Sequence, residues 1–360
     1  MSYTGSSEDP EKEAKDMLYV GGDVHKKTVQ VCVLDAEGNR VAQSRIANTP
    51  EKVIGYFGGI EQPASVAIEA SHNWGVLCDV LGEMGFETHV CHSREAKLIG
   101  LARVSTDKVD AYKLATLLRV GLLPEAYVPD SDGRELRALV RGRASLVRSS
   151  TGQKNQIHAI LRSNWIEHPY SDVFGKAGRK FLESLKLEGG YRAVVDAKLK
   201  ILDRIKEQTA VLDEEIKHRA HIDMRAMIID TAPGFGEFRS VMFLAEVGDI
   251  NRFRSAESFV CYTGLNPRED SSGDRIRRGR ITKEGSSWLR WILVEAAHDA
   301  VEQDGKIRDL YLRVLEKKGD KVAIVAAARE LAVSLYWMLK RMEVYRPSGK
   351  KDSLITSEAR

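Results

Sequence analysis

The chain has 360 residues, more than twice the usual size of one domain, so we expect two domains or one domain with a long helical insert. Hydrophobic residues make up 43% of it and charged residues 30%, which supports a sizeable core and excludes a disordered or fibrous chain. The net charge of +3 is too small to identify a partner.

Neither a membrane span nor a structural metal is expected. The longest apolar stretch, 322–339, is interrupted by Arg329 and Glu330. The four cysteines lie far apart and form no CxxC pair. Residues 1–16 are polar and acidic, and we expect a disordered N-terminus without the apolar core of a signal peptide. These features are typical of a cytosolic protein.

The first predicted domain, residues 17–132, mixes strands and helices. Apolar runs at 17–22, 29–34 and 40–46, separated by Gly, Asn and Asp, indicate a hairpin or three-stranded meander. Helices are then expected at 51–58, 74–84, 93–101 and 107–120, and strands at 64–68, 87–91 and 125–128. This order predicts a mixed sheet covered on both faces. It matches the ribonuclease H-like arrangement, and actin-like ATPases begin in a similar way.

The rest of the chain is predicted to be mainly helical. Two long helical stretches at 134–162 and 191–220 form a segment at 133–221, which we interpret as a coiled-coil arm or dimer contact, with ordinary intramolecular helix packing as the commoner alternative. The composition changes near Met224, and a mainly α domain is expected at 222–345, with a flexible tail at 346–360.

Basic residues gather in two places. Residues 134–162 hold seven Lys or Arg against one acid, and residues 275–290 hold six against one. Two such patches on a nearly neutral chain favour a polyanion site about as much as solvated helix faces. The candidate nucleic-acid contacts are Arg134, Arg137, Arg141, Arg148, Lys154, Arg275, Arg277, Arg278, Arg280 and Lys283.

Four acids stand where strands end or a helix begins. Asp23 and Glu69 each end a predicted strand, so both can project from neighbouring strands of one sheet. Asp107 and Asp110 lie three residues apart at a helix start, on one face. Four converging carboxylates repel one another unless cations bind, and two Mg²⁺ ions, or Mn²⁺ in their place, would relieve the repulsion and serve phosphoryl chemistry. Taken singly, Asp107 also suits a helix cap and Glu69 a hydrated strand end, so both interpretations stay open here.

A loop in the C-terminal half, TGLNPREDSSGDRIRRGRITKEG, carries Ser271 and Ser272 beside Gly273. A serine becomes a nucleophile only when a base, a metal or positive charge activates it. The arginines here could bind a phosphodiester and stabilise developing charge. From the residues alone this segment is a phosphate-binding turn.

Two further motifs favour structural roles. TAPGFGEF resembles half of a helix-hairpin-helix, whose amides hold a DNA phosphate, but a helix N-cap turn is the preferred interpretation. His89 and His92 flank Cys91, and their strand position favours a buried, hydrogen-bonded role over metal binding. His25 follows Asp23 closely enough to help at the site, although no role is assigned to it.

Together these segments resemble the DEDD transposases of the insertion-sequence-110 family and their relatives among the site-specific DNA invertases. The match runs in family order from about Leu18 to Ala297. The motifs that carry it are VGGDVHKKTV, VAIEASHNWG, STDKVDAYKLATLL, APGFGEFRSVMFLAEVGDINRF and YTGLNPREDSSGDRIRRGRITKEGSSWLRWILVEAA. TDKVDA and the Ser-Gly loop followed by GRITKEG are the most specific of them.

The resemblance implies a RuvC-like domain whose metal ligands are Asp23, Glu69, Asp107 and Asp110. It implies a nucleophilic serine that carries over to Ser272, with Ser271 as the fallback. Double-stranded element ends and target DNA would be cut and rejoined through a phosphoserine link, by a homo-oligomer (dimer or tetramer) whose coiled coil reaches between subunits. Some family members are directed by a structured guide RNA, and such a protein works at the nucleoid of a bacterium or archaeon.

The chain departs from the family at one motif, because Phe235 and Glu237 replace residues of the commoner Pro-Gly-Ile/Val-Gly-Pro turn. Three other functions remain open. An actin-like sugar kinase or ATPase would share the opening Gly-Gly-Asp, a RuvC-type junction endonuclease would share the acids and release free ends, and a non-enzymatic DNA-binding protein would use only the basic patches.

Overall fold

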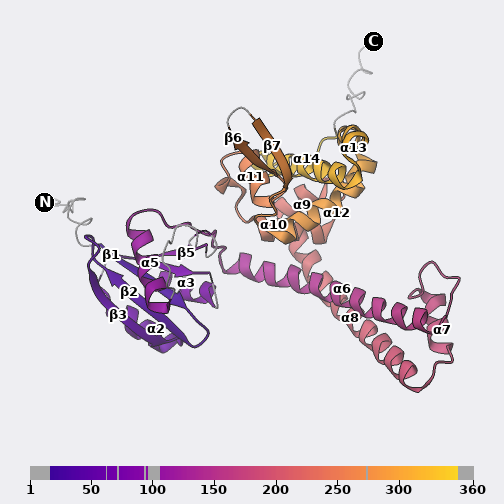
Figure 1. The fold of residues 1–360 in the computed structure, drawn as a ribbon, viewed down its shortest axis with the longest axis horizontal. Helices are drawn as coiled ribbons and strands as arrows, with labels where there is room; N and C mark the ends of the chain where they lie inside the picture. The colour runs from indigo at the N-terminus through magenta and orange to yellow at the C-terminus, as the bar shows by residue number, and fades with distance from the viewer. Residues whose placement is uncertain are drawn as a thin grey trace, which may run out of the picture. The chain divides into compact units, whose positions relative to one another are not determined.

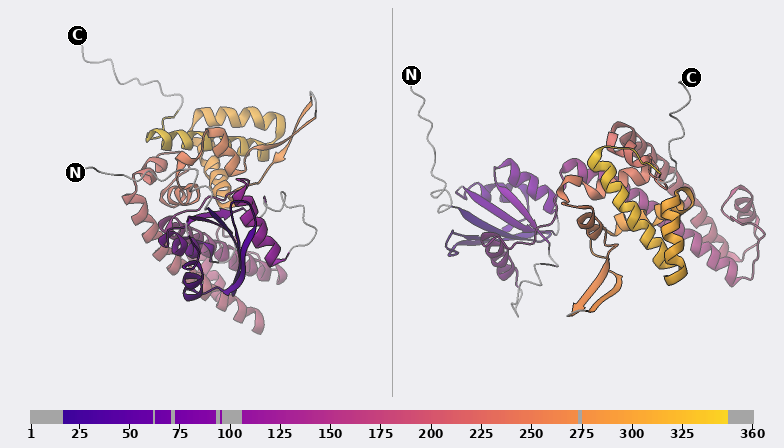
Figure 2. Two further views of the ribbon diagram at one scale, coloured as in Figure 1. Left: turned by 90° about the vertical axis from the view of Figure 1, so that its left-hand side faces the viewer. Right: turned by 90° about the horizontal axis from the view of Figure 1, so that it is seen from above.

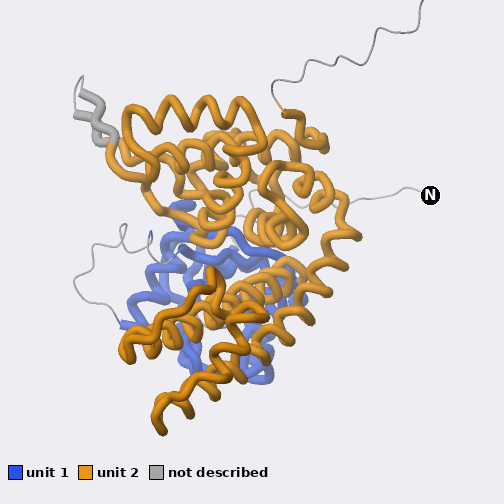
Figure 3. Tube along the Cα trace, turned by 90° about the vertical axis from the view of Figure 1, so that its right-hand side faces the viewer, with its two compact units in different colours: residues 1–131 blue, residues 132–360 orange. Residues whose placement is uncertain are grey.

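The computed structural model describes residues 17–61, 63–70, 73–92, 95, 106–272 and 275–347. The chain divides into two compact units, unit 1 at 1–131 and unit 2 at 132–360 (Figure 3). The predicted disordered N-terminus, most of the predicted helix at 93–101 and most of the predicted tail lie outside the described residues.

Unit 1 is built on the mixed sheet that the sequence predicts (Figure 1). Its strands stand in the order β3-β2-β1-β4-β5, with β1, β2 and β3 antiparallel and β1, β4 and β5 parallel. Their bounds are β1 Leu18–Val24, β2 Thr28–Leu34, β3 Arg40–Ala47, β4 Ala64–Glu69 and β5 Glu87–Cys91. Mixed sheets of this kind need cover on both faces, because their central strands are apolar on each side.

The two faces of the sheet differ in what covers them. Val20, Val31 and Phe57 belong to a core shared with α2 (Pro50–Phe57) and α3 (Trp74–Glu83). On the other face lies α5 (Asp107–Arg119), whose Ala111 and Ala115 pack with buried residues of β2. The alternation of side chains along each strand therefore assigns one set of residues to α2 and α3 and the other set to α5.

The strand expected at 125–128 is reduced to one bridge, between Glu125 and Cys91. The segment still pairs with the end of β5, because the backbone N–H of Ala126 donates to Val90 O at 2.7 Å. Pro124 and Pro129 flank it. Proline supplies no backbone donor, which limits this stretch to a short edge pairing.

Unit 2 begins with two long helices that run side by side in opposite directions, α6 (Ser131–Ser163) and α8 (Gly189–Ile222), with α7 (Lys176–Ser184) between them in sequence (Figure 1). Glu135 pairs with Arg219 and Arg143 with Asp213, so residue numbers rise along α6 as they fall along α8. Around α7, buried Ile157, Leu182 and Leu199 form a separate small core. The predicted helical arm therefore exists, and its coiled-coil geometry stays a prediction.

The remainder of unit 2 is mainly helical, as predicted. Its elements are α9 Met224–Asp230, α10 Glu237–Val247, the short helix η1 Ile250–Arg252, α11 Ala256–Thr263, β6 Pro267–Ser272, β7 Arg275–Ile281, α12 Ser287–Gln303, α13 Gly305–Lys318 and α14 Asp320–Arg341. Val140 of α6 and Ile216 of α8 belong to the same core as these helices. The C-terminal core thus begins on the helical arm.

Within the described residues, α14 is the one helix long and apolar enough to cross a membrane by length and composition. Its Ala327, Leu331 and Leu335 are fully buried in the core of unit 2. A helix that buries its apolar side chains against other helices has no apolar face left for lipid. We therefore assign α14 as the central core helix of unit 2.

Candidate active site

The strand register places the two strand-borne acids side by side. Gly22 of β1 pairs with Ile68 of the parallel strand β4, and Asp23 and Glu69 are the residues that follow them. On its other side Asp23 pairs with Gln30 of β2. Residues in one such row point to the same face of a sheet, so Asp23 and Glu69 share the face that carries α5.

A glycine brings the helix-borne acids to the same place. A Cβ atom built on Gly21 would lie 2.0 Å from the carbonyl oxygen of Ala111 and 2.6 Å from the backbone nitrogen of Ala115, so α5 lies directly on β1. Thr106 caps this helix by accepting a hydrogen bond from the Val109 N–H. Asp107 therefore stands in the first turn, beside the end of β1.

His25 joins two of these acids. Its Nε2 atom lies 3.2 Å from Oδ2 of Asp23 and 3.3 Å from Oδ1 of Asp107. One ligand atom from each of the three residues lies within 4.8 Å of the others, and no other such group of His, Cys, Asp and Glu occurs in the described part of the chain. The sequence assigned His25 no role, although its spacing two residues after Asp23 was visible.

The other three predicted acids all act electrostatically on Asp23. Burial is the main cause that raises the pKa of Asp23, His25 lowers it, and Glu69, Asp107 and Asp110 each raise it further. Asp23 is only 4% exposed, and Asp110 is held by Lys113 at 3.0 Å. Carboxylate oxygens are the donors that Mg²⁺ and Mn²⁺ prefer, and a dication would relieve the repulsion around Asp23. The residues present therefore fit a divalent cation.

The predicted serine loop is a β-hairpin rather than an irregular loop, and it projects from the helices of unit 2 (Figure 2). Ser271 pairs with Ile276 and Ser272 with Arg275, so Ser272 is the last residue of β6 before the turn. The register also places Asp270 opposite Arg277 and Glu269 opposite Arg278. Residues of opposite charge at facing positions favour such a pairing, and the sequence pattern of the loop carried this signal.

The base of the hairpin is fixed by close backbone contacts. A Cβ on Gly285 would lie 1.9 Å from the carbonyl oxygen of Tyr262, and one on Gly264 would lie 2.2 Å from that of Glu284. Both glycines have positive φ, +84° and +68°. Only glycine combines that backbone conformation with such an approach, so the two ends of the hairpin are held together on α11 and α12.

Comparison with known proteins places both units in one family. A family model of IS110-type DEDD transposases, with the description "Transposase", matches residues 20–166. A second family model, with the description "Transposase IS116/IS110/IS902 family", matches residues 226–312. The chain belongs to the IS110 family of DEDD transposases. Both matches are to transposases, so they support the transposase interpretation and not the actin-like kinase or ATPase.

Relatives of this transposase match along much of its length. It is 24% identical to the transposase for insertion sequence element IS1111A of Coxiella burnetii, over 93% of each chain. It is 25% identical to a probable family 20 transposase of Pseudomonas aeruginosa, over 91% of this chain and 98% of the other. A pilin gene-inverting protein of Moraxella bovis is 27% identical over 71% of each chain.

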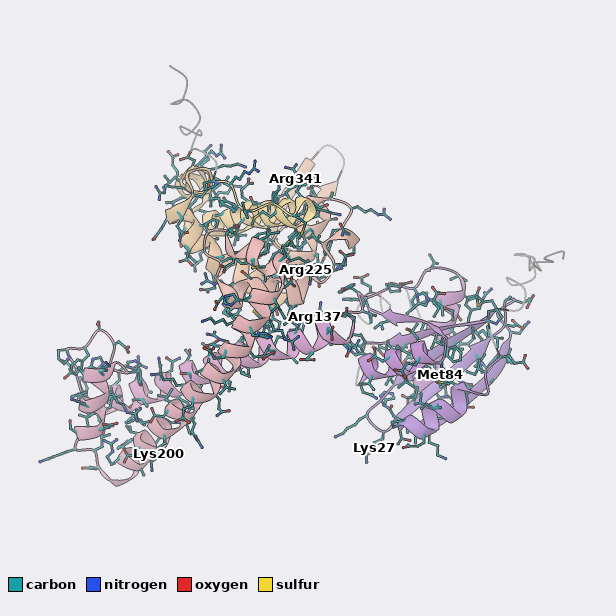
Figure 4. The ribbon with its side chains drawn as sticks, turned by 180° about the vertical axis from the view of Figure 1, so that it is seen from behind. Lys27, Met84, Arg137, Lys200, Arg225 and Arg341 are labelled. Atoms are coloured by element: carbon teal, nitrogen blue, oxygen red, sulfur yellow. The ribbon has the colours of Figure 1, made fainter. Side chains whose placement is uncertain are left out.

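The basic residues of α6 make contacts inside unit 2 of the transposase. Arg137, labelled on α6 in Figure 4, donates to the carbonyl oxygens of Ala245 and Glu246. Arg141 forms two hydrogen bonds with the Glu246 carboxylate. The guanidinium of Arg148 lies 5.1 Å above the ring of Trp288, and the Lys154 ammonium 5.2 Å from that of Phe174. Nucleic-acid contact by these residues and by Arg134 stays a prediction.

The second basic patch is partly described. Arg280 and Lys283 are exposed at the end of the hairpin and just after it. The positions of Arg275, Arg277 and Arg278 in β7 are known from the backbone register, and their side chains lie outside the described residues. Nucleic-acid binding at these five positions also stays a prediction.

The remaining motifs have structural roles. Gly234 of the Pro-Gly-x-Gly turn has a positive φ of +77°, and its Cβ would lie 2.3 Å from the carbonyl oxygen of Ala296, so this turn packs on α12. His89 lies between Glu125 at 3.0 Å and Glu87 at 3.6 Å. His92 is half exposed and pairs with Glu95 at 3.6 Å. The burial predicted for this histidine pair is wrong, because His89 is only partly buried and His92 lies exposed just after β5. The predicted hydrogen-bonded role fits His89 better than His92.

Proposed function

We propose that this transposase moves an insertion sequence by cutting and rejoining double-stranded DNA through a phosphoserine link formed by Ser272. The observation that carries the proposal is that buried Asp23 lies with His25 and Asp107 in one group of possible metal ligands, while Glu69, Asp107 and Asp110 each raise the pKa of Asp23. Carboxylates gathered without matching cations destabilise a fold, so this arrangement supports a metal-dependent site.

Asp23, Glu69, Asp107 and Asp110 would hold Mg²⁺, two ions in our proposal, and Mn²⁺ would replace it. When bound, the cations supply charge that neutralises the phosphate under attack and the departing oxygen. Burial and close packing hold Asp23 and the first turn of α5 in place before substrate arrives. The protein thus presents the carboxylates without reorganising at the moment of reaction.

The covalent step belongs to Ser272. Its Oγ atom forms a bond to the scissile phosphorus while a bond between phosphorus and a deoxyribose oxygen breaks, and the serine proton ends on the departing oxygen. A hydroxyl of a second DNA end then attacks the phosphoserine and releases Ser272. Each step exchanges one phosphodiester bond for another, so rejoining needs no high-energy cofactor.

The test is a denaturing gel of the protein incubated with element-end DNA and Mg²⁺. Wild-type protein should form a covalent DNA adduct, and Ser272→Ala should form none while still binding DNA. Ser271→Ala, one residue away in the same strand, is the matched control and should retain the adduct. Adduct in the Ser272→Ala variant but not in Ser271→Ala would move the nucleophile to Ser271. Cleavage without any adduct would favour a RuvC-type endonuclease.

The proposal extends to the assembly. A homo-oligomer, dimer or tetramer, would bring the acidic site and a serine hairpin to the same phosphate, with the helical arm as a contact between subunits. A structured guide RNA is the partner that the family resemblance adds, and the cytoplasmic nucleoid is the expected place of action. Light scattering of the purified protein, with and without element-derived RNA, tests the assembly and the RNA together.

A further inference from the structure

A polar groove of about 850 Å³ lies beside the acidic site, entirely within unit 1. Its lining comes from β2, from the edge strand β3 and from the start of α5. We call it the β3 groove, and its principal residues are Gln30, Gln43, Arg45, Thr106, Asp107 and Lys108. Asp107 belongs both to the groove and to the acidic site, so the two are continuous.

The sheet register explains the continuity. Arg45 of β3 pairs with Gln30 of β2, and Gln30 pairs with Asp23 of β1. Since residues of one row share a face, the row from Asp23 to Arg45 leads from the buried carboxylate to the edge of the sheet. Gln30 is only 3% exposed, and its Nε2 donates to the carbonyl oxygen of Ser44 at 2.9 Å. The floor of the groove is therefore ordered.

The groove carries two cations that form no ion pair within the described part of unit 1. Arg45 is exposed, and its guanidinium makes one long hydrogen bond, 3.4 Å to Oγ1 of Thr28. Lys108 is exposed at the second position of α5. Gln43, two residues before Arg45 in β3, donates to the Lys108 carbonyl oxygen at 3.3 Å. Cations and amide groups beside a site for phosphate chemistry suit phosphate oxygens rather than base edges.

We propose that the β3 groove binds the DNA backbone next to the phosphate that is cut, with Arg45 and Lys108 each contacting a flanking phosphate. This inference rests on the proposed function, because it takes DNA to be the molecule whose phosphate reaches Asp107. Such contacts carry no sequence information. They fix the position of the DNA strand, so that the scissile phosphate stays at the acidic site and the DNA does not slide past it.

The experiment measures how DNA affinity depends on salt. Full-length protein carrying Ser272→Ala binds a fluorescent random-sequence DNA duplex without covalent capture, and the binding constant is followed over a series of KCl concentrations. Affinity falls as salt rises, and each lost phosphate contact reduces the magnitude of the slope of log affinity against log salt by about one. Arg45→Gln and Lys108→Gln should each reduce this magnitude by about one, and the double variant by about two.

Two controls separate this effect from a general loss of charge or of fold. Lys52→Gln removes an exposed lysine from α2, on the other face of the sheet, and should leave the slope unchanged. Arg45→Lys retains the charge, and the slope should stay near that of the parent. Thermal melting of every variant confirms that the protein is folded.

Unchanged slopes in Arg45→Gln and Lys108→Gln would overturn the proposal, as would an Arg45→Lys slope as low as that of Arg45→Gln. A slope change seen with an RNA duplex and not with DNA would overturn it as well, since the groove would then bind RNA. The adduct gel on a Ser272-containing protein is read separately. If the slopes are reduced but no adduct forms, the DNA-binding role of the β3 groove is supported and the serine chemistry is rejected.

Discussion

Both units of the transposase bury carboxylates, and Glu246 of unit 2 and Asp23 of unit 1 have opposite surroundings. Glu246 of α10 is 1% exposed, accepts two hydrogen bonds from Arg141 at 2.7 and 2.9 Å, and accepts a third from Oγ of Ser286 at 2.7 Å. Asp23 of β1 is 4% exposed, its one ion-pair partner among the described residues is His25 at 3.2 Å, and Glu69, Asp107 and Asp110 each raise its pKa. An arginine and a hydroxyl compensate the Glu246 charge, whereas a single histidine faces Asp23.

The surroundings of the two carboxylates indicate a structural role for Glu246 and a functional role for Asp23. A buried charge that is paired and hydrogen-bonded ties elements together, here α6 to α10 and to the start of α12. A buried carboxylate among other carboxylates weakens the fold, because each repels the next. Such an arrangement is retained where a ligand supplies the missing charge. Three predictions follow from the contrast, in order of expected effect.

Asp23→Asn should have the largest effect, on activity. If Asp23 is a ligand of the proposed metal site, removing its charge should lower adduct formation by at least about a thousandfold, the size of effect that removal of an essential catalytic group produces. The metal-free variant should melt at the same temperature as the wild type or higher, because repulsion is removed. Wild-type protein should be stabilised by Mg²⁺ in thermal melts, and the variant should lose this response.

Glu37→Gln is the matched control, since Glu37 is an exposed acid in the turn between β2 and β3. It should keep both the adduct and the response to Mg²⁺. An Asp23→Asn protein that still responds to Mg²⁺ as the wild type does would contradict the assignment of the acidic site.

Much of unit 1 could be predicted from its sequence. Alternating apolar runs give the order of strands, and Asp23 and Glu69 are conspicuous because each follows such a run. Whether the acids come together depends on the register of β1 against β4 and on where α5 packs on the sheet. Neither can be read directly from a single sequence. The sequence places His25 near the site but gives it no role, because only the fold shows that it lies between Asp23 and Asp107.

Unit 2 shows the opposite limit. Two basic patches together favour a nucleic-acid surface about as much as solvated helix faces, and in the first patch Arg137 and Arg141 also serve the packing of α10. Nothing local in the sequence distinguishes an arginine that meets a buried glutamate more than a hundred residues away from one that meets solvent. The serine hairpin was taken for a loop because its strands are polar and short, and its register is set by cross-strand pairing.

The second prediction concerns stability. Glu246→Ala should lower the free energy of unfolding of unit 2 by about 3–5 kcal/mol, because it leaves Arg141 without its partner in a partly buried position. Denaturant unfolding of the full chain measures this loss. Glu214→Ala, at an exposed position on α8, should change the free energy by less than about 0.5 kcal/mol.

A double replacement makes the same prediction sharper. Glu246→Leu combined with Arg141→Met removes both charges and fills a similar volume, so most of the lost stability should return. If the double variant is as unstable as Glu246→Ala, packing and not the ion pair accounts for the role of Glu246.

The third prediction tests what holds the acids of unit 1 together, since no network like that of Glu246 is present around Asp23 in the described residues. We infer that the close backbone contact of α5 with Gly21 holds Asp107 near Asp23 instead. Gly21→Ala places a Cβ 2.0 Å from the Ala111 carbonyl oxygen, and the resulting shift of α5 should lower the free energy of unfolding by about 1–3 kcal/mol. Moving Asp107 away from Asp23 should also reduce the stabilisation by Mg²⁺ in thermal melts.

The contrast with another glycine isolates the contact. Gly82 lies in α3, and a Cβ there meets no atom within 4 Å, so Gly82→Ala should raise stability by about 0.4–1 kcal/mol through the lower entropy of the unfolded chain. Chemically identical substitutions should therefore change stability in opposite directions within one unit. If Gly21→Ala left both the stability and the response to Mg²⁺ unchanged, the position of α5 would not depend on this contact, and the acids would need another cause for their convergence.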